Sequence, residues 1–200
     1  MLKRALYICA CVAGLAGLAV MPAHAVTVVV DAFNNSSSGG AGLATGLNLT
    51  IGQTFTVTSS TNDLWSAGDL PRYSDGSGLT GDRFASASDD SGRPVGSQIG
   101  GDFGLWSQHS INVPYGSLVG EIGGSFFLIG ANFTGQAIAS GPLSLYYWDS
   151  NQFDNFGSIT FDVNAAAVPG PIVGAGLPGL VMALGGFVAW RRRRNQAAAA

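Results

Sequence analysis

The stretch LNLTIGQTFTVTSS, residues 47–60, carries the clearest periodic pattern in the chain. Phe55 and Val57 alternate there with threonines at positions 54, 56 and 58. A period of two predicts a β-strand with one buried face and one face in contact with water. The Ile-Gly-Gln turn at 51–53 separates this strand from another strand piece before it. The stretch therefore indicates short strands joined by tight turns.

Apolar strand patterns continue on both sides of this stretch. The β-branched segment VTVVVDAF, residues 26–33, predicts a first strand, and residues 117–133 predict a hairpin around Gly123-Gly124. The segments at 141–149 and 157–163 predict a final pair of strands. Seven or eight short antiparallel strands without helices indicate an all-β domain, a β-sandwich or jelly roll, over residues 26–163.

The composition supports strands and turns over helices. The chain has 200 residues with 30 glycines, and only 10% of its residues are charged. It contains one Lys and one Glu, so the residues that favour helices are scarce. We expect a flexible loop at 34–46 and a long irregular segment, rich in Gly, Ser and Asp, at 66–113.

Charge is distributed unevenly along the chain. Between positions 26 and 167, three arginines stand against twelve acidic residues, which gives a net charge of −9. An acidic body repels phosphate backbones, so we expect no nucleic-acid partner. Acidic loops are suited instead to hard cations such as calcium.

The N-terminal segment, residues 1–25, predicts a secretory signal peptide. Lys3 and Arg4 precede an apolar run at 5–20, and Ala23 and Ala25 form a small-residue cleavage site. A retained membrane anchor is the alternative. Both cysteines of the chain lie inside the segment, so the mature protein, starting at Val26, would contain no disulfide and no thiolate metal site.

The C-terminal end predicts a single transmembrane helix at 172–190. These nineteen residues lack charge, and as a helix they would be roughly 28 Å long, close to the hydrocarbon core of a bilayer. Arg191, Arg192, Arg193 and Arg194 would stop transfer, with residues 191–200 as a basic cytoplasmic tail. A buried core helix is the alternative, but the arginine cluster disfavours it.

The segment before this span completes a three-part pattern. The linker at 164–171 ends in the motif Val168, Pro169, Gly170 and Pro171, and an apolar span and an arginine cluster follow. The pattern resembles the PEP-CTERM sorting signal of bacterial surface proteins, with Gly170 where that family usually has Glu. The resemblance implies an exosortase-type processing enzyme as partner, with inner-membrane anchoring followed by display at the cell surface or release. A plain tail anchor behind a proline-rich stalk is the alternative.

The stretch YYWDSNQFDNFGS, residues 146–158, is the candidate for a binding site. Asp149 ends one expected strand, and Asp154 and Asn155 lead into the next. Their side chains would meet at one rim of the sandwich, and calcium prefers such carboxylate and amide oxygens. On the residue types alone, an ordinary Asp-Asn turn is the stronger alternative.

A second resemblance spans roughly 110 residues. The run TIGQTFTVT, LWSAG, GSLVGEIGG and GPLSLYYWDSNQFDNFGSITFDV resembles the calcium-dependent PA-I type lectins, which have a galactose-binding domain-like β-sandwich. The resemblance implies calcium as cofactor, held by Asp149, Asp154, Asn155 and the backbone carbonyl of Gly68. It also implies that the metal contacts two hydroxyls of a galactose-like glycan.

The sugar-selecting residues of that family have no secure match here, so the sugar-binding residues stay unassigned. His109, the only histidine of the mature chain, is more typical of a surface loop than of a ligand. Trp106 and Tyr115 could stack on a sugar ring, although a single aromatic in such a loop is usually core filling.

Three classes of function follow for the exported body. The first is a non-catalytic, calcium-dependent, lectin-like binding protein displayed in an extracellular polysaccharide matrix. The second is a structural or adhesive matrix protein without a retained ligand site. We do not expect an enzyme, because the mature chain lacks the usual nucleophile and base, and adjacent acids such as Asp89 and Asp90 are normally solvated.

Overall fold

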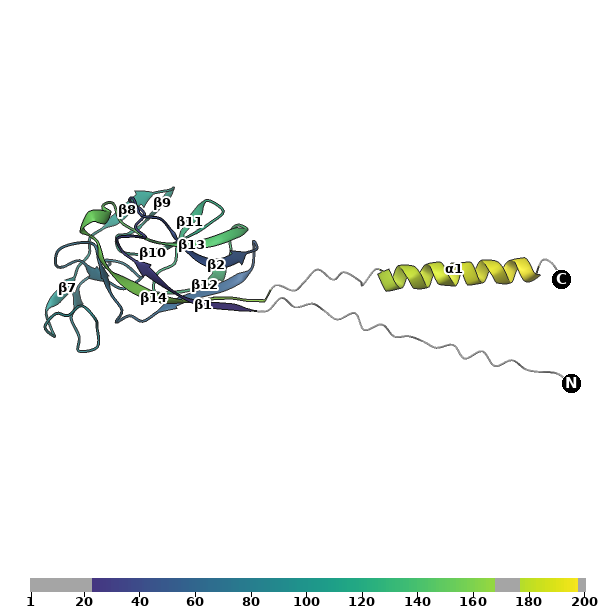
Figure 1. Cartoon of the computed structure of the whole chain (residues 1–200), viewed down its shortest axis with the longest axis horizontal. Helices are drawn as coiled ribbons and strands as arrows, with labels where there is room; N and C mark the ends of the chain where they lie inside the picture. The colour runs from purple at the N-terminus through teal and green to yellow at the C-terminus, as the bar shows by residue number, and fades with distance from the viewer. Residues whose placement is uncertain (1–22, 168–176, 198–200) are drawn as a thin grey trace. The chain divides into compact units, whose positions relative to one another are not determined.

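The computed structural model of the chain describes residues 23–167 and 177–197 (Figure 1). Residues 23–167 form a β-rich body, and the second described segment is the helix α1, Leu177–Ala197. The predicted sorting motif at 168–171 and most of the predicted signal peptide lie outside the described residues. Ala23 and Ala25, at the predicted cleavage site, are described, and Ala25 lies in the first strand opposite Asn164.

Two antiparallel sheets and two small strand pairs make up the body, which confirms the all-β sandwich prediction. The six-stranded sheet contains β1 (His24–Asp31), β3 (Thr54–Ser59), β4 (Trp65–Ser66), β5 (Tyr73–Ser74), β12 (Asn132–Gln136) and β14 (Phe156–Ala165). The four-stranded sheet contains β2 (Leu43–Leu49), β10 (Leu118–Ile122), β11 (Ser125–Leu128) and β13 (Gly141–Tyr147). The small pairs are β6 (Arg83–Phe84) with β7 (Gln98–Gly100), and β8 (Leu105–Gln108) with β9 (Ile111–Pro114). The finer assignment to a jelly roll stays a prediction.

The strand β14 organises the larger sheet. Along its length it pairs with β1, with β3 and, through its first two residues, with β4. Because β1 comes from the start of the body and β14 from its end, their eight paired positions join the two ends side by side (Figure 1). The pairing of β14 with β4 places the loop after β4 beside the loop before β14.

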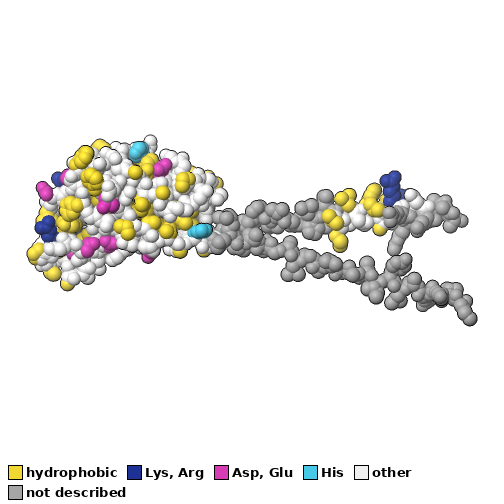
Figure 2. Space-filling view, in the orientation of Figure 1, with side chains coloured by type: hydrophobic (Ala, Val, Ile, Leu, Met, Phe, Trp, Pro, Cys, Tyr) yellow, Lys and Arg dark blue, Asp and Glu magenta, His cyan; other side chains and the backbone are white. Residues whose placement is uncertain are grey.

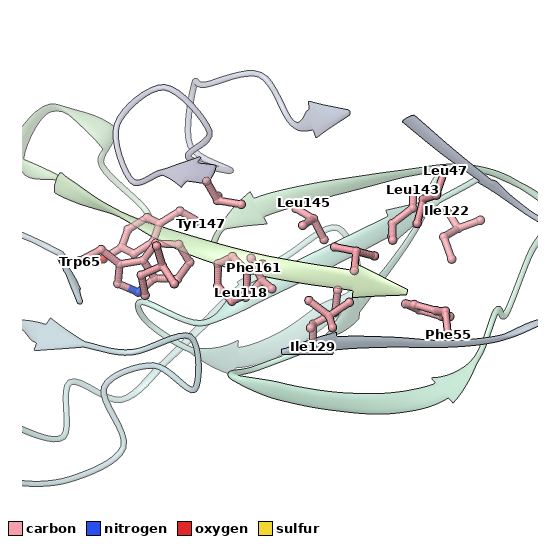
Figure 3. Packing of buried hydrophobic residues seen from close by; sticks show 14 of the residues in the cluster. Leu47, Phe55, Trp65, Leu118, Ile122, Ile129, Leu143, Leu145, Tyr147 and Phe161 are labelled. Carbon is pink, nitrogen blue, oxygen red and sulfur yellow. The ribbon is translucent and has the colours of Figure 1, made fainter. Parts of the chain in front are cut away.

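The hydrophobic core fills the space between the two sheets. Alternate residues of β14 are buried, among them Ile159 and Phe161, while their neighbours in the strand face water. On β3, Phe55 and Val57 are buried as the period of two predicts. Figure 3 shows Trp65 and Tyr147 at one end of this core, and their ring centroids are 4.7 Å apart.

The structure differs from the sequence-based expectation in three places. The loop expected at 34–46 ends earlier, because β2 already begins at Leu43. The strands on either side of the turn at 51–53 do not pair with each other: β2 pairs with β13, and β3 pairs with β12 and β14. The segment at 66–113 is not uniformly irregular, since it contains the short strands β5 to β9.

The C-terminal helix differs from the predicted membrane span. It begins at Leu177 rather than at 172, and it continues through all four arginines to Ala197. Pro178 lies in its first turn, where a proline is tolerated because its missing N–H would have no helical partner. Among the described residues, no helix combines the length and the apolar character needed to cross a membrane.

Candidate functional site

The loop between β13 and β14 is held in shape by its own side chains. It contains a single 3₁₀ turn, Gln152–Asp154, which Asn151 caps by accepting a hydrogen bond from the Phe153 N–H at 3.3 Å. The Asn151 amide also donates to Asp154 Oδ1 at 2.8 Å. An asparagine cap before a short turn is a locally favourable arrangement, so the sequence itself specifies this loop conformation.

Asp149 is a buried carboxylate at the start of this loop, and only 4% of its surface is exposed. Its Oδ2 accepts a hydrogen bond from the Asn151 N–H at 3.1 Å. Burial raises the pKa of Asp149, and hydrogen bonds from the backbone of Asn151 and Ser150 and from the Asn155 side chain offset part of that rise. The negative charge of Asp154 raises the pKa further. The site therefore contains a carboxylate that lacks enough compensation for its desolvation.

Asn155 is also buried, and one of its side-chain atoms has no partner. Its Nδ2 donates to the backbone carbonyl of Ala32 at 3.2 Å, which fixes the amide orientation because only nitrogen can donate there. Its Oδ1 is then buried without a hydrogen-bond partner among the described residues. An unpaired buried carbonyl oxygen is uncommon in native proteins and marks a place where a ligand fits.

Gly68 reaches the same place from the loop after β4. Its φ of +115° lies in a region that favours glycine, and a Cβ there would come within 2.9 Å of Asp154 Oδ2. The Gly68 carbonyl accepts a hydrogen bond from Ser66 Oγ at 2.8 Å. The structure thus brings Gly68 against Asp154, and Asp154 lies in one short loop with Asp149 and Asn155.

Arg72 was not foreseen as part of the site. Its Nη1 lies 3.6 Å from Asp154 Oδ2 and 3.2 Å from the Ala67 carbonyl, which accepts a hydrogen bond from it. Its guanidinium carbon lies 4.3 Å from the centre of the Phe103 ring. No local motif surrounds Arg72 in the sequence, so the only available signal was the scarcity of arginines in the body.

Tyr147 lies beneath the same residues. It is fully buried, and its hydroxyl has no hydrogen-bond partner among the described residues. Burial raises its pKa well above the ordinary value for a tyrosine, and the nearby charges of Asp149 and Asp154 add to the rise. The charges that act on this hydroxyl indicate that both carboxylates converge on one end of the core.

Aromatic side chains border the loop on one side. Phe103 and Tyr115 meet edge to face with their ring centroids 5.0 Å apart, and the Tyr115 hydroxyl lies 3.3 Å from Ser150 Oγ. Trp106 lies 6.0 Å from Tyr115, centroid to centroid. These rings border a possible ligand position as well as packing on each other.

His109 and the acidic pair have local roles in the described structure. His109 lies at the turn of the β8–β9 hairpin and stacks on Phe126, with 4.1 Å between the ring centroids. Asp89 accepts hydrogen bonds from Ser86 and Ser91 of its own loop, and Asp90 accepts one from the Leu64 N–H. The acidic pair therefore organises a turn.

The donor set has the chemistry of a calcium site. It offers two carboxylates, an amide oxygen without a partner and a backbone carbonyl, and calcium accepts all three kinds of oxygen. Within residues 23–167 and 177–197, no group of three or more His, Cys, Asp or Glu side chains is placed to hold a metal. A metal in this loop would therefore depend on the neutral oxygens as well as on the two carboxylates.

Comparisons with known proteins add little to the class that the sheets define, a β-sandwich protein. No protein-family profile and no curated protein matches the chain. A solved structure described as "EclA N-terminal domain; PllA-like lectin" is similar, with 18% identity and a TM-score of 0.43, over 74% of this chain and 98% of that one. At that TM-score, the assignment of the fold depends on the sheet topology described above.

Proposed function

We propose that this chain is a non-catalytic carbohydrate-binding protein that depends on calcium. The observation that carries the proposal is the buried Asn155 Oδ1 without a partner, next to the buried carboxylate of Asp149. Burying a carboxylate and a free carbonyl oxygen is costly unless a cation compensates both. The resemblance of this loop to PA-I type lectins supports the same assignment.

In this proposal, Asp149 and Asp154 neutralise a divalent cation, and Asn155 and Gly68 contribute neutral oxygens. Calcium bound there would offer free coordination positions to two neighbouring hydroxyls of a sugar. The Asn155 amide is held by Ala32, so its oxygen is aimed before any ion arrives. The Asn151 cap similarly fixes Asp154. The protein thus supplies a prearranged set of oxygens, which lowers the entropic cost of binding.

The experiment is a thermal melt of the protein in calcium and in chelator. An ion that binds only the folded state raises the melting temperature, and at a concentration of 100 times Kd it adds about 2.7 kcal/mol of stability. We expect calcium to raise the melting temperature of the natural protein and to leave that of Asp149→Asn unchanged. Isothermal titration with galactose in calcium then tests sugar binding directly.

Asp162→Asn is the matched control. Asp162 is an exposed aspartate on β14 whose Oδ1 accepts a hydrogen bond from Thr27, outside the loop of the site. Its substitution changes the net charge by the same amount as Asp149→Asn, so its calcium response should match that of the natural protein. Identical melting temperatures in calcium and chelator for the natural protein would contradict the proposal.

Export completes the proposal and depends on the sequence alone. The signal-peptide pattern at 1–25 and the sorting pattern at 168–171 support delivery of the body outside the cell and processing by an exosortase-type enzyme. The setting would be an extracellular polysaccharide matrix. An adhesive matrix protein without a ligand is the other class, and the melt in calcium distinguishes the two.

A further inference from the structure

Arg72 lies next to the candidate calcium site but is only loosely bound to it. At 3.6 Å, its distance to Asp154 Oδ2 exceeds that of an ordinary N–H···O hydrogen bond. Its hydrogen bonds among the described residues use Nη1 alone, although a guanidinium has five N–H donors. A third of its side chain is exposed. Most of its donors are therefore available to a ligand.

The surroundings hold the guanidinium in place without saturating it. Phe103 supports one face of the group at 4.3 Å, and the Ala67 carbonyl binds one edge. Phe103 packs on Tyr115, whose hydroxyl reaches Ser150, the neighbour of Asp149. The contacts thus form a closed circuit from Arg72 through the aromatic pair to the carboxylates and back. Arg72 stands on the rim of the same site.

Calcium would change the charge balance of this rim. Without an ion, Asp149 and Asp154 leave one negative charge after Arg72 is counted. A divalent cation cancels both carboxylates and leaves the charge of Arg72 uncompensated. The ion also competes for Asp154, which weakens its attraction for Arg72. A planar, positively charged fork beside a site for sugar hydroxyls is suited to a carboxylate.

We propose that Arg72 makes this site selective for sugars that carry an anionic group, with the carboxylate of a uronic acid as the matching ligand. The inference rests on the proposed function, because it specifies the ligand class of that same site. The ring of the sugar would lie toward Phe103 and Tyr115, and its carboxylate would meet the free edge of the guanidinium. Arg72 is thus a specificity-determining residue.

Titration with two matched sugars tests the inference. Galactose and galacturonic acid differ only at C6, where one has a hydroxymethyl group and the other a carboxylate. In calcium we expect the full-length protein to bind galacturonic acid about tenfold more tightly than galactose, since a charge-assisted hydrogen bond is worth that much. Arg72→Gln should reduce this ratio to about one, while galactose binding and the calcium-induced rise in melting temperature are retained.

The outcomes separate this inference from the proposed function. A calcium response with equal affinity for both sugars overturns the role of Arg72 and leaves the calcium-dependent function intact. If Arg72→Gln removes the calcium response itself, Arg72 is structural and the inference is wrong. If the natural protein shows neither a calcium response nor sugar binding, both proposals fail together.

Two further arms identify the anionic group and exclude a solution effect. Galactose 6-sulfate that binds as well as galacturonic acid, and through Arg72, supports recognition of negative charge, whereas binding of the sulfate alone overturns the carboxylate assignment. Asp149→Asn should bind neither acid. Binding of galacturonic acid that survives in this variant would place the acid elsewhere and contradict the inference.

Discussion

At the scale of single residues, the site is defined by polar groups that the fold buries without full compensation. Leaving a buried donor or acceptor unpaired costs roughly 1–3 kcal/mol, and Asn155 Oδ1 is such an atom. Asp149 adds a carboxylate whose pKa is raised chiefly by burial. An ion in the loop relieves both costs at once, so stability and binding are linked at these two residues.

The raised pKa of Asp149 predicts how the calcium effect depends on pH. Calcium binds the ionised carboxylate, so the increase in melting temperature should disappear as pH falls through the raised pKa of Asp149. In chelator the sign reverses: the folded state binds the proton more tightly than the unfolded state, so this group stabilises most below pH 3.8 and loses its contribution as pH rises through the raised value. Melts from about pH 3.5 to about pH 7, in calcium and in chelator, measure both.

Asp149→Asn is the comparison for these melts, because it cannot titrate. The difference between the two proteins in chelator should shrink toward acid, where the natural carboxyl is also neutral. A calcium increment that stays constant down to the lowest pH would show that Asp149 does not bind the ion.

Several site residues could be named from sequence, and others could not. Asp149, Asp154 and Asn155 fall in one short loop, so spacing and resemblance were enough to nominate them as a group. Arg72 and Phe103 are 31 positions apart, and only the folded chain brings them together. No pattern in the intervening sequence could have indicated that contact.

At the scale of elements, the site depends on how closely β14 approaches β4. Gly157 has a φ of +86°, and a Cβ there would lie 3.0 Å from the Leu64 carbonyl oxygen and from Trp65 Cα. This glycine allows Phe156 and Gly157 to pair with β4 while the site loop turns beside them. The position of Gly68 relative to Asp154 follows from that pairing.

Gly157→Ala should therefore lower the free energy of unfolding and weaken calcium binding. The left-handed backbone and the close contact together predict a loss of roughly 1–3 kcal/mol in urea denaturation. Gly46→Ala is the matched control, because Gly46 has a φ of +79° with nothing within 4 Å of a Cβ. The control carries the backbone strain alone, so equal losses in the two variants would refute the role of the close approach.

The strands were predicted better than their pairing. The period of two identified β3, and the hairpin of β10 and β11 around Gly123-Gly124 is confirmed. The turn at 51–53 was also found, but it connects the two sheets and does not close a hairpin. Alternation reports that a strand has a buried face, and it does not report which strand will lie beside it.

At the scale of the whole molecule, the body is closed on itself by its two ends. The main core cluster draws its buried residues from positions 30–165, and β1 covers β14 over eight paired positions. Figure 2 shows acidic side chains and exposed hydrophobic side chains spread over this face of the body. Nothing in the main core cluster comes from the helix α1.

A fragment of residues 23–167 should therefore unfold in a single cooperative transition. Because the core and both sheets lie inside these bounds, we expect its melting temperature to match that of the full chain, measured by circular dichroism. A second fragment, residues 32–167, lacks β1 and exposes the edge of β14, so it should be unfolded or strongly destabilised. A folded second fragment would contradict the role given to the pairing of β1 with β14.

The sequence by itself determined the class of the fold, the buried faces of the strands and the loop that carries the carboxylates. These features depend on neighbours a few positions apart, and local physics expresses them as periodicity and turn residues. Tertiary structure alone decided which strands share a sheet, that Gly68 touches Asp154, and that Arg72 stands on the rim over Phe103. Those contacts join distant positions through the packing of two sheets, and no local preference encodes such packing.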